Sequence, residues 1–376
     1  MRNRAKSRNA KKIRYAVVGL GYISQAAVLP AFAHAAENSE LVALVSGDPR
    51  KLLALSRKYK VPRTYSYEHY SECLNSGEID AVYIALPNNL HRAYTESAAQ
   101  SGIHVLCEKP MAFDETDCDA MIAVTEGAGV KLMIAYRLHF EPGNLHAIEV
   151  VNSGRIGEPR IFTSTFSQQV RAGNSRLKAR VGGGALYDMG IYCINAARYV
   201  FRAEPEEVLA WNMSSSDKRF KEVPEMTSAL MKFSNDRVAS FTCSFGAADC
   251  SFFEVAGTKG TLKMEPAYDM TGDLKSEVTI GGRITTRIFK SRDQFAPELI
   301  YFSNCILKNK QPEPSGREGL ADVRIIRALQ ESAEINRPIA ISPWQMKRRP
   351  GRAEEMPEEP AVVQPRLVRA AAPAAP

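Results

Sequence analysis

The sequence has no long apolar run and no clustered cysteines, and each absence excludes a class of protein. No stretch approaches the roughly 20 apolar residues that a membrane-spanning helix needs, and no secretory signal core follows the basic start of the chain. The seven cysteines are scattered without a C-x-x-C pair, which argues against structural zinc and against a disulfide framework. We therefore predict a cytoplasmic protein with no membrane partner and no bound metal.

Acidic residues are missing from the first twelve positions, and this explains most of the basic balance of the chain. Residues 1–12 hold six of the seven excess positive charges, so the remainder is nearly neutral and has no basic stripe for nucleic acid. Like charges keep such an arm extended, and we expect 1–12 to be disordered. Pro, Ala, Glu and Arg dominate the other end without periodicity, so we expect the tail 346–376 to be disordered as well.

The body of the chain opens with a glycine motif. Ile13–Val18 reads as a buried strand, and the run Gly-Leu-Gly-Tyr-Ile-Ser follows it directly and opens a helical pattern over 25–36. In this βαβ setting the motif predicts a dinucleotide site. The first glycine allows the tight turn, and the second lets the backbone approach a pyrophosphate at the helix N-terminus. The cofactor-binding residues expected from this loop are Gly19, Leu20, Gly21, Tyr22 and Ile23.

The end of the second strand has a serine where NAD-binding proteins place an acid for the ribose 2′-hydroxyl. The stretch reads Ser-Gly-Asp-Pro-Arg-Lys over residues 46–51. Ser46 presents no carboxylate to repel a 2′-phosphate, and Arg50 and Lys51 can pair with that phosphate. We therefore expect NADP as the cofactor, bound here by Ser46, Gly47, Arg50 and Lys51. If the register is shifted by two residues, Asp48 is the acid that counts and the preference is open again.

Further strand–helix units bring more loops to the same edge of the sheet, where ligands collect. Strand 81–86 ends in a Pro-Asn loop, and strand 103–107 runs straight into Glu-Lys-Pro. That proline limits the freedom of the backbone around the lysine. With a last strand at 131–135, residues 13–136 are predicted to form a Rossmann domain. Its later loops are expected to give the cofactor site Leu86, Pro87, Asn88, His91, Glu108 and Lys109.

The pattern changes after residue 136. A helix over 142–153 is followed by short alternating strands whose turns carry Asn-Asp, Lys-Gly and Gly-Gly pairs, which predicts an antiparallel sheet. The fold class is therefore an α/β Rossmann domain followed by an α+β domain, 137–345, with an open, mostly antiparallel sheet. Helices over 294–308 and 317–336 close this second domain.

Alternation along two of these strands predicts two different faces for the sheet. One face is apolar and is expected to pack on helices, and it carries Ala229, Met231, Phe233, Phe241, Cys243 and Phe245. The other face, with Thr242 and Ser244, needs a partner if the sheet is broad. We therefore expect a homo-dimer or homo-tetramer.

A glycine run interrupts the strands at 182–195. It contains Asp188 and Tyr192, which are four residues apart and so share one face of a helix. An acid and a phenol side by side behind three glycines predict a site that the backbone must approach closely.

Together these motifs resemble the Gfo/Idh/MocA family, named for glucose–fructose oxidoreductase and inositol dehydrogenase. Within that family, Ser46-Gly47 with Lys51 and a tyrosine at 192, where most relatives carry histidine, are similar to the branch of glucose–fructose oxidoreductase and dihydrodiol or xylose dehydrogenase. The resemblance covers about residues 13–345 and rests on Val18–Gly21, Leu86–Asn88, Cys107–Pro110, Tyr136–His139 and 182–195.

The resemblance implies that Lys109, Asp188 and Tyr192 are catalytic and meet over the nicotinamide, with Arg137 and Arg176 also at the cofactor site. It further implies NADP, oxidation of a cyclic sugar at C1, and subunits that pair through the second sheet. Relatives carry a Trp-Arg pair shortly before the glycine run. Here the matching stretch, 174–177, reads Asn-Ser-Arg-Leu, so the tryptophan is absent and the sugar is not identified.

The expected chemistry is hydride transfer from C1 of a pyranose, with loss of the C1 hydroxyl proton, to give a lactone. A tyrosine phenol has an ordinary pKa of about 10, so Tyr192 needs an adjacent cation to act as a base, and Lys109 supplies one. Alternatively, Lys109 is itself the base and Tyr192 is its hydrogen-bonding partner. Asp188 would orient Lys109 and accept a sugar hydroxyl.

We predict an aldose dehydrogenase with exchangeable NADP, because the short charged arm offers nothing that would lock a cofactor in place. The first alternative is a sugar transhydrogenase of glucose–fructose oxidoreductase type, whose NADP does not dissociate. A non-catalytic NADP-binding sensor is the second, and the presence of Lys109, Asp188 and Tyr192 together argues against it. An NAD-dependent glycosidase of the same fold is the third, and Ser46 argues against that.

Overall fold

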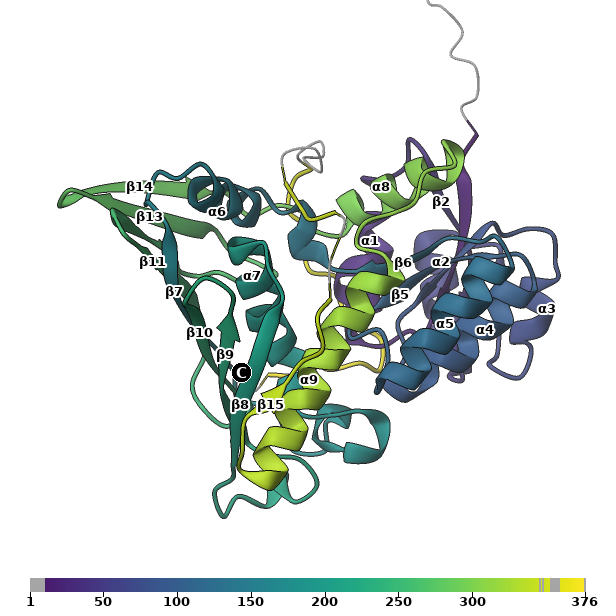
Figure 1. Ribbon diagram of the computed structural model, residues 1–376. Helices are drawn as coiled ribbons and strands as arrows, with labels where there is room; N and C mark the ends of the chain where they lie inside the picture. The colour runs from purple at the N-terminus through teal and green to yellow at the C-terminus, as the bar shows by residue number, and fades with distance from the viewer. Residues whose placement is uncertain (1–10, 345, 347, 352–358, 375–376) are drawn as a thin grey trace, which may run out of the picture.

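The computed structural model describes residues 11–344, 346, 348–351 and 359–374. Almost all of the basic arm, for which we expected disorder, lies outside these residues. The chain forms two domains side by side, and its C-terminal helices contribute to both (Figure 1). In the described part of the chain, no helix combines the length and the apolar character needed to cross a bilayer.

The first domain is a Rossmann domain, as the sequence predicts. Its sheet has six parallel strands in the order β3-β2-β1-β4-β5-β6. The order reverses between β1 and β4, and in such sheets the ligand cleft lies beyond the carboxyl ends of the strands at this point. The strands are β1 (Ile13–Val18), β2 (Ser39–Val45), β3 (Arg63–Tyr65), β4 (Ala81–Ile84), β5 (His104–Glu108) and β6 (Leu132–Ala135).

Carboxylate caps start two of the connecting helices. Asp48 accepts hydrogen bonds from the N–H groups of Arg50 and Lys51 at the start of α2 (Pro49–Tyr59). Asp114 accepts one from the N–H of Asp117 at the start of α5 (Glu115–Gly127). Each cap satisfies N–H groups that have no partner within the helix. The remaining connections include α3 (Tyr70–Leu74) and α4 (His91–Gln100).

The first crossover helix begins and ends earlier than the predicted helix over 25–36. It runs without a break from Tyr22 to Ala31, with a π-helical stretch over Ser24–Val28 followed by α1 (Leu29–Ala31). A later helix, α8 (Ala296–Leu307), returns to the first domain and packs against β1 and β2. Leu299 and Phe302 of α8 join the core that contains β1. The expected division at residue 136 therefore does not hold for α8, which packs on the first domain.

The second domain has the open, mostly antiparallel sheet that the sequence predicts. Its nine strands follow the order β14-β13-β12-β11-β7-β10-β9-β8-β15, and β7 pairs with β10 in parallel. The strands are β7 (Pro159–Ser167), β8 (Pro205–Met213), β9 (Met226–Phe233), β10 (Arg237–Ser244), β11 (Cys250–Gly257), β12 (Gly260–Met264), β13 (Leu274–Ile280), β14 (Arg283–Phe289) and β15 (Ile339–Ala340).

The two faces of this sheet differ as expected. Within the described residues, helices cover only the face turned toward the first domain, and these are α6 (Pro142–Asn152), α7 (Ile191–Phe201) and α9 (Gly316–Ile335) (Figure 1). The six apolar residues predicted for the packed face are all at most 2% exposed. Ser244, predicted for the open face, is instead buried, and its hydroxyl accepts hydrogen bonds from the Gly246 and Ala247 N–H groups. The open face carries exposed Ile161, Trp211, Leu230, Val238, Ile284 and Ile288.

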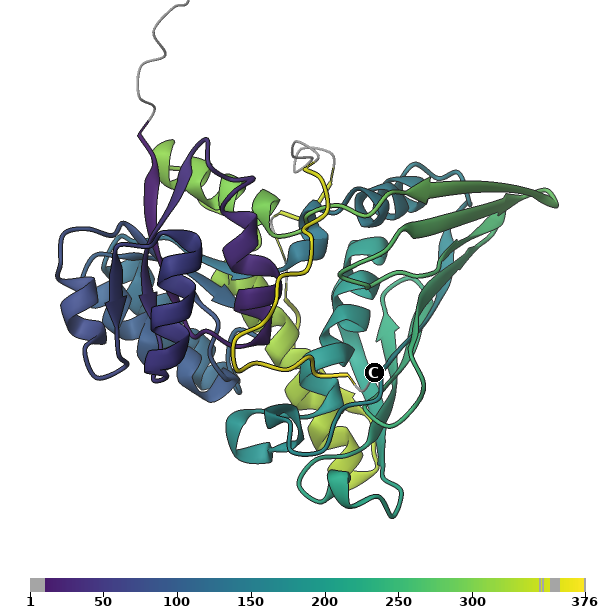
Figure 2. The ribbon, with the colours of Figure 1, turned by 180° about the vertical axis from the view of Figure 1, so that it is seen from behind.

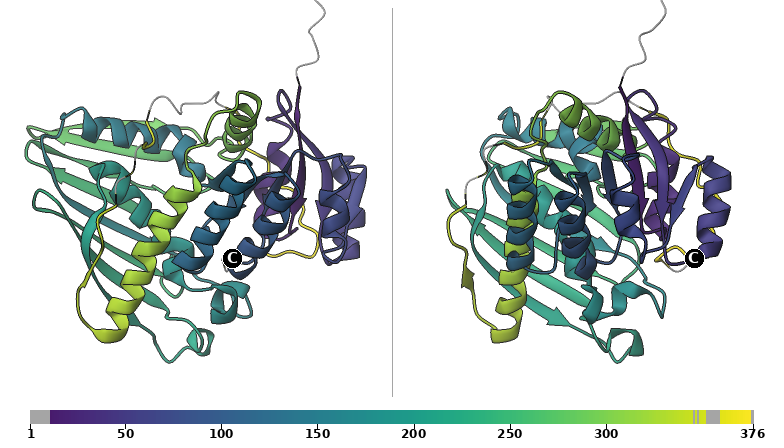
Figure 3. Two further views of the ribbon diagram at one scale, coloured as in Figure 1. Left: turned by 45° about the vertical axis from the view of Figure 1, so that its right-hand side comes forward. Right: turned by 90° about the vertical axis from the view of Figure 1, so that its right-hand side faces the viewer.

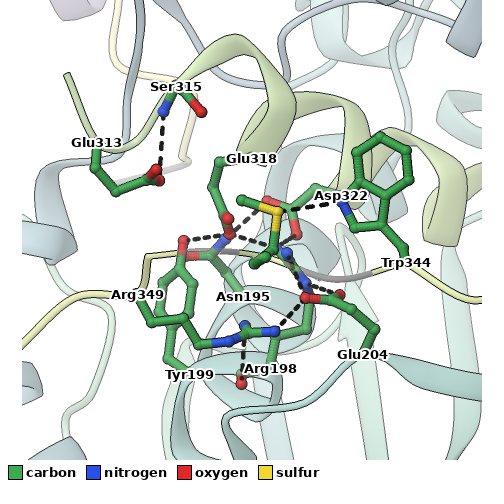
Figure 4. A network of polar contacts seen from close by, with 11 residues as sticks. Asn195, Arg198, Tyr199, Glu204, Glu313, Ser315, Glu318, Asp322, Trp344 and Arg349 are labelled. Carbon is green, nitrogen blue, oxygen red and sulfur yellow. Dashed lines mark hydrogen bonds and ion pairs between the residues drawn. The ribbon is translucent and has the colours of Figure 1, made fainter. Parts of the chain in front are cut away.

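Helix α9 connects the two domains. It packs on α5 and β6 of the first domain and on β8 of the second (Figure 3). Its buried carboxylates Glu318 and Asp322 each accept a hydrogen bond from Arg198 of α7 at 2.6 Å, and Glu204 does the same. Figure 4 shows these side chains converging on Arg198. Because a buried charge is stable only with partners, the network fixes the position of α7 against α9.

The C-terminal tail also departs from expectation. Composition predicts disorder over 346–376, yet residues 359–374 follow an extended path with contacts to both domains. Figure 2 shows this yellow segment running down between the domains and then turning toward the second sheet. The path is set by partners that are distant in the sequence, such as Val170, which pairs with Ala374. Residues 352–358 of the tail lie outside the described part.

Candidate active site

The carboxyl ends of the parallel strands open onto a cavity of about 830 Å³ between the two domains. The loops after β1, β4, β5 and β6 line one side of it, and the glycine run with the start of α7 lines the other. The cavity therefore brings together most of the residues that the sequence predicts for the site. Those that line it are Gly21, Tyr22, Ile23, Leu86, Pro87, Asn88, Glu108, Lys109, Arg137, Arg176, Asp188 and Tyr192.

The glycine turn after β1 is shaped for close approach. Gly19 has a φ of +94°, and a Cβ there would lie 2.4 Å from the carbonyl oxygen of Ala85, so no other residue fits without a shift. At Gly21 a Cβ would meet nothing within 4 Å, which leaves open space for a pyrophosphate. Ser24 donates its hydroxyl to the Gly19 carbonyl at 2.5 Å. The Leu20 side chain is buried in the core, so only its backbone belongs to the loop.

Asp188 lies between two cations. Its Oδ1 accepts a hydrogen bond from Lys109 Nζ at 3.0 Å, and its Oδ2 accepts one from Arg176 Nε at 2.6 Å. Lys109 Nζ also donates to the backbone carbonyl of Asp188 at 2.8 Å. Burial alone would raise the pKa of Asp188, but Arg176 and Lys109 lower it more, so its pKa lies well below the ordinary value. Asp188 is therefore ionised at neutral pH and holds both cations in place.

Lys109 faces Tyr192 as well as Asp188. Its Nζ lies 4.7 Å from the centroid of the Tyr192 ring. Burial lowers the pKa of Lys109, but the charges of Asp188, Tyr192 and Glu108 raise it more, so its pKa lies above the ordinary value. Lys109 is therefore protonated at neutral pH and presents a fixed positive charge to the phenol.

Arg137 is a second cation at the same phenol. Its Nε donates to the Tyr192 oxygen at 3.3 Å, and its guanidinium carbon lies 5.0 Å from the ring centroid. The rest of the guanidinium is held by Gln294 Oε1 and by the carbonyl of Tyr268. Sequence reasoning missed Gln294 and Tyr268, because they lie more than a hundred positions from Arg137 and belong to no local motif.

The glycine run makes close contacts with the backbone of Arg176 and with the side chain of Asn88. A Cβ at Gly183 would lie 2.3 Å from the carbonyl oxygen of Arg176, and one at Gly182 would lie 2.8 Å from the Cβ of Asn88. Asn88 Nδ2 also donates to the Gly182 carbonyl at 2.8 Å. Asn174 caps the short turn before the run through the N–H of Arg176. Glycine is therefore needed at 182, where the run contacts the loop after β4, and at 183, where it contacts the backbone of Arg176.

His91, which was predicted to bind the cofactor, does not line the cavity. It is fully buried at the first residue of α4. Its Nε2 faces the Leu86 carbonyl at 2.9 Å, and its Nδ1 faces the Pro110 carbonyl at 3.0 Å. Burial lowers the pKa of His91. The ring braces the two loops that carry Pro87 and Lys109, and so it acts on the site indirectly.

Ser46, Gly47, Arg50 and Lys51 do not line this cavity but lie beside it, at the end of β2. Gly19 N–H donates to the Val45 carbonyl at 2.9 Å, which places the β2 end next to the glycine turn. The Asp48 carboxylate is occupied, because Oδ1 caps α2 and Oδ2 accepts from Arg369 Nε at 2.7 Å. Asp48 is therefore a helix cap. Arg369 was not predicted, and no local motif marks it.

Comparison with known proteins agrees with this architecture. A model described as an oxidoreductase family with an NAD-binding Rossmann fold matches residues 13–136, and the model of the Gfo/Idh/MocA C-terminal domain matches residues 144–263. The chain belongs to the Gfo/Idh/MocA oxidoreductase family. The resemblance seen in the motifs is thereby confirmed.

Several relatives of this Gfo/Idh/MocA protein have been named or solved. The structure of aldose-aldose oxidoreductase from Caulobacter crescentus is 37% identical with a TM-score of 0.84, covering 88% of this chain and 100% of that one. A 3-ketoreductase from Actinomadura kijaniata, solved with NADP and TDP-benzene, is 26% identical with a TM-score of 0.78, covering 86% and 98%. D-xylose 1-dehydrogenase (NADP⁺) from Haloarcula marismortui is 31% identical over 88% of this chain and 93% of its own length.

Proposed function

We propose that the protein is an NADP-dependent oxidoreductase that transfers hydride from C1 of a cyclic aldose to the nicotinamide and so forms a lactone. The observation that carries the proposal is the cluster of Lys109, Asp188 and Tyr192, which lies in the same cavity as the glycine turn. The names of two relatives, a xylose dehydrogenase and an aldose–aldose oxidoreductase, support an aldose as the substrate.

The residues at the edge of the parallel sheet fit NADP. The turn at Gly19 and Gly21 would hold the pyrophosphate, and Ser46 with the cations Arg50 and Lys51 would hold the 2′-phosphate. Because Asp48 is occupied as a helix cap, it does not serve as the acid that would select NAD. When bound, the nicotinamide supplies the carbon that accepts the hydride.

We assign the proton transfer to Tyr192, and the two cations beside its ring, Lys109 and Arg137, support this choice. Its phenol oxygen takes the proton of the sugar C1 hydroxyl, and Lys109 and Arg137 stabilise the negative charge that this oxygen carries before the transfer. Lys109 is the less suitable base, because its pKa is raised and it keeps its own proton. Asp188 holds Lys109 and Arg176 in position, and each of its oxygens retains capacity to accept a sugar hydroxyl.

Direct transfer between two sugars is the second candidate function. It is favoured by the segment 359–374, whose residues Gln364 and Ala372–Ala374 border the same cavity and could slow the exchange of the cofactor. A non-catalytic sensor has no such support, since a sensor does not need Lys109, Asp188 and Tyr192 around one cavity.

The proposal is tested by assaying D-xylose and D-glucose with NADP⁺ and identifying the product by mass and by NMR. We expect a lactone, and we expect Tyr192→Phe and Lys109→Met to lower kcat by roughly 10²–10⁴-fold while the Kd for NADP⁺ changes little. Lys308→Met, at an exposed position far from the cavity, is the matched control and should keep full activity.

Two results would contradict the proposal. Wild-type protein that binds no NADP(H) would exclude the whole assignment. Protein that binds NADP(H) but oxidises no aldose, with or without a second sugar as acceptor, would exclude aldose chemistry and favour the sensor. Free NADPH formed at steady state supports the dehydrogenase, whereas sugar-to-sugar transfer without free NADPH supports the second candidate.

A further inference from the structure

The segment 359–374 spans the mouth of the cavity from one edge of the second domain to another. Pro360 pairs with Arg292, just before α8, and Ala374 pairs with Val170, just after β7. Both anchors belong to the chain beyond the Rossmann domain, but the residues between them cross to that domain and return (Figure 2). The family matches end at residue 263, so this crossing is a feature that they do not include.

The middle of the segment is held on the glycine turn. Val368 N–H donates to Gln25 Oε1 at 2.7 Å, and Gln25 Nε2 donates to the Val368 carbonyl at 3.0 Å. The same Nε2 donates to the carbonyl of Leu20, inside the turn, at 2.9 Å. Gln25 is only 1% exposed, and a buried amide of this kind keeps its partners. The segment is therefore fixed beside the place where a pyrophosphate would lie.

The next residue reaches the end of β2. Arg369 Nε donates to Asp48 Oδ2 at 2.7 Å, while Asp48 Oδ1 caps α2. The carboxylate of Asp48 would repel a 2′-phosphate bound at Ser46, and Arg369 neutralises it. The two terminal nitrogens of Arg369 have no hydrogen bond to any residue that the structure describes, so they remain available to a phosphate, for which a guanidinium is well suited.

The last part of the segment closes over the chemical end of the cavity. The cavity that contains Lys109 and Asp188 is also lined by Gln364, Ala372, Pro373 and Ala374. Arg171 N–H donates to the Pro373 carbonyl at 3.0 Å, which holds this part on the second domain. A dinucleotide extended from Ser46 to Lys109 would thus have the segment along its length.

We propose that residues 359–374 form a strap over the dinucleotide, and that Arg369 of this strap is a specificity-determining residue for the 2′-phosphate of NADP. The proposal rests on the cofactor assignment made above. It differs from the expectation of freely exchanging NADP, which considered only the N-terminal arm. The strap adds positive charge where NADP differs from NAD, and it must leave Gln25 before the cofactor can depart.

The test compares three full-length variants with the wild type. Arg369→Gln removes the charge, and Arg366→Gln is its control, since Arg366 lies on the same segment and has no hydrogen bond to another described residue. Val368→Pro removes the N–H that Gln25 accepts without touching Arg369. The Kd values of NADP⁺ and NAD⁺ are measured by calorimetry. The NADPH release rate is measured by stopped-flow fluorescence with excess NADP⁺ as chase, and thermal unfolding checks that each variant is folded.

We expect Arg369→Gln to weaken NADP⁺ binding about tenfold, equivalent to about 1.4 kcal/mol, and to leave the Kd for NAD⁺ unchanged. Arg366→Gln should change neither Kd. We expect Val368→Pro to speed NADPH release at least about tenfold. An equal loss for both cofactors, or no loss, would overturn the role of Arg369. If folded Val368→Pro releases NADPH at the wild-type rate, or binds NADP⁺ more tightly than the wild type, the role of residues 359–374 as a strap is wrong, while the cofactor assignment stands. Wild-type protein without affinity for NADP(H) would overturn both.

Discussion

Replacing Arg198 by methionine should destabilise the fold strongly, and the loss should depend on pH. Arg198 is fully buried and donates to Glu204, Glu318 and Asp322 at 2.6 Å each. Methionine keeps much of the volume but leaves Glu318 and Asp322 in the interior without their cation, while Glu204 keeps its second partner, Arg349. Removing one partner of a buried ion pair costs about 3–5 kcal/mol. We therefore expect the free energy of unfolding to fall by about that amount near neutral or mildly alkaline pH.

The sign of the pH dependence follows from Asp322. Burial raises its pKa, Arg198 lowers it in part, and the balance leaves it at about 7. In the unfolded chain an aspartate has a pKa of about 3.9. Between this pKa and that of Asp322 in the folded protein, the folded state binds more protons than the unfolded state. The stability that Asp322 contributes is present at low pH and is lost as the pH rises toward 7. Without Arg198 the pKa of Asp322 rises further, so the deficit of the variant should be smaller near pH 5 than near pH 8.

Urea titrations followed by circular dichroism at about pH 5 and about pH 8 measure this difference. Arg317→Met is the control, because Arg317 pairs with Glu126 on the surface, where an ion pair contributes at most about 1 kcal/mol. The variant Arg198→Met with Glu318→Gln and Asp322→Asn should regain much of the loss, since no unpaired charge remains on α9. A deficit below about 1 kcal/mol near pH 8, or one of equal size at both pH values, would refute this account of the network.

Two further predictions concern the cofactor and the assembly. Ser46→Asp should reduce the ratio of NADP⁺ to NAD⁺ affinity at least about tenfold, because a carboxylate at the end of β2 repels the 2′-phosphate. The control Ser56→Asp, at a half-buried position in the last turns of α2, should leave this ratio unchanged. Calorimetry with both cofactors measures the ratio, and an unaltered ratio in Ser46→Asp would contradict the placement of the 2′-phosphate. The open face of the second sheet, which carries exposed Trp211 and Ile284, should pair with a second copy of the chain. Light scattering at micromolar concentration should therefore give at least the mass of a dimer, and the mass of a monomer would contradict this pairing.

Local patterns in the sequence determined the architecture and the centre of the site. The alternation of strands and helices predicts the Rossmann sheet, and parallel connection then brings the strand ends to one edge. The first glycine of the turn, Gly19, is required by sterics, because a Cβ there would collide with the carbonyl of Ala85. Lys109, Asp188 and Tyr192 could be named in advance because each follows a local signal: a strand end before proline, or a four-residue spacing behind glycines.

Only the tertiary structure decided which distant groups meet. The return of α8 to the first domain depends on apolar contacts between residues far apart in the sequence, such as Leu299 with the core that contains β1. Arg137 with Gln294, Arg198 with Asp322, and Arg369 with Asp48 are pairs more than a hundred positions apart. Composition alone predicts a disordered tail, because it records the lack of periodicity in residues 359–374 and not the partners, Gln25 and Val170, that the rest of the fold presents to them.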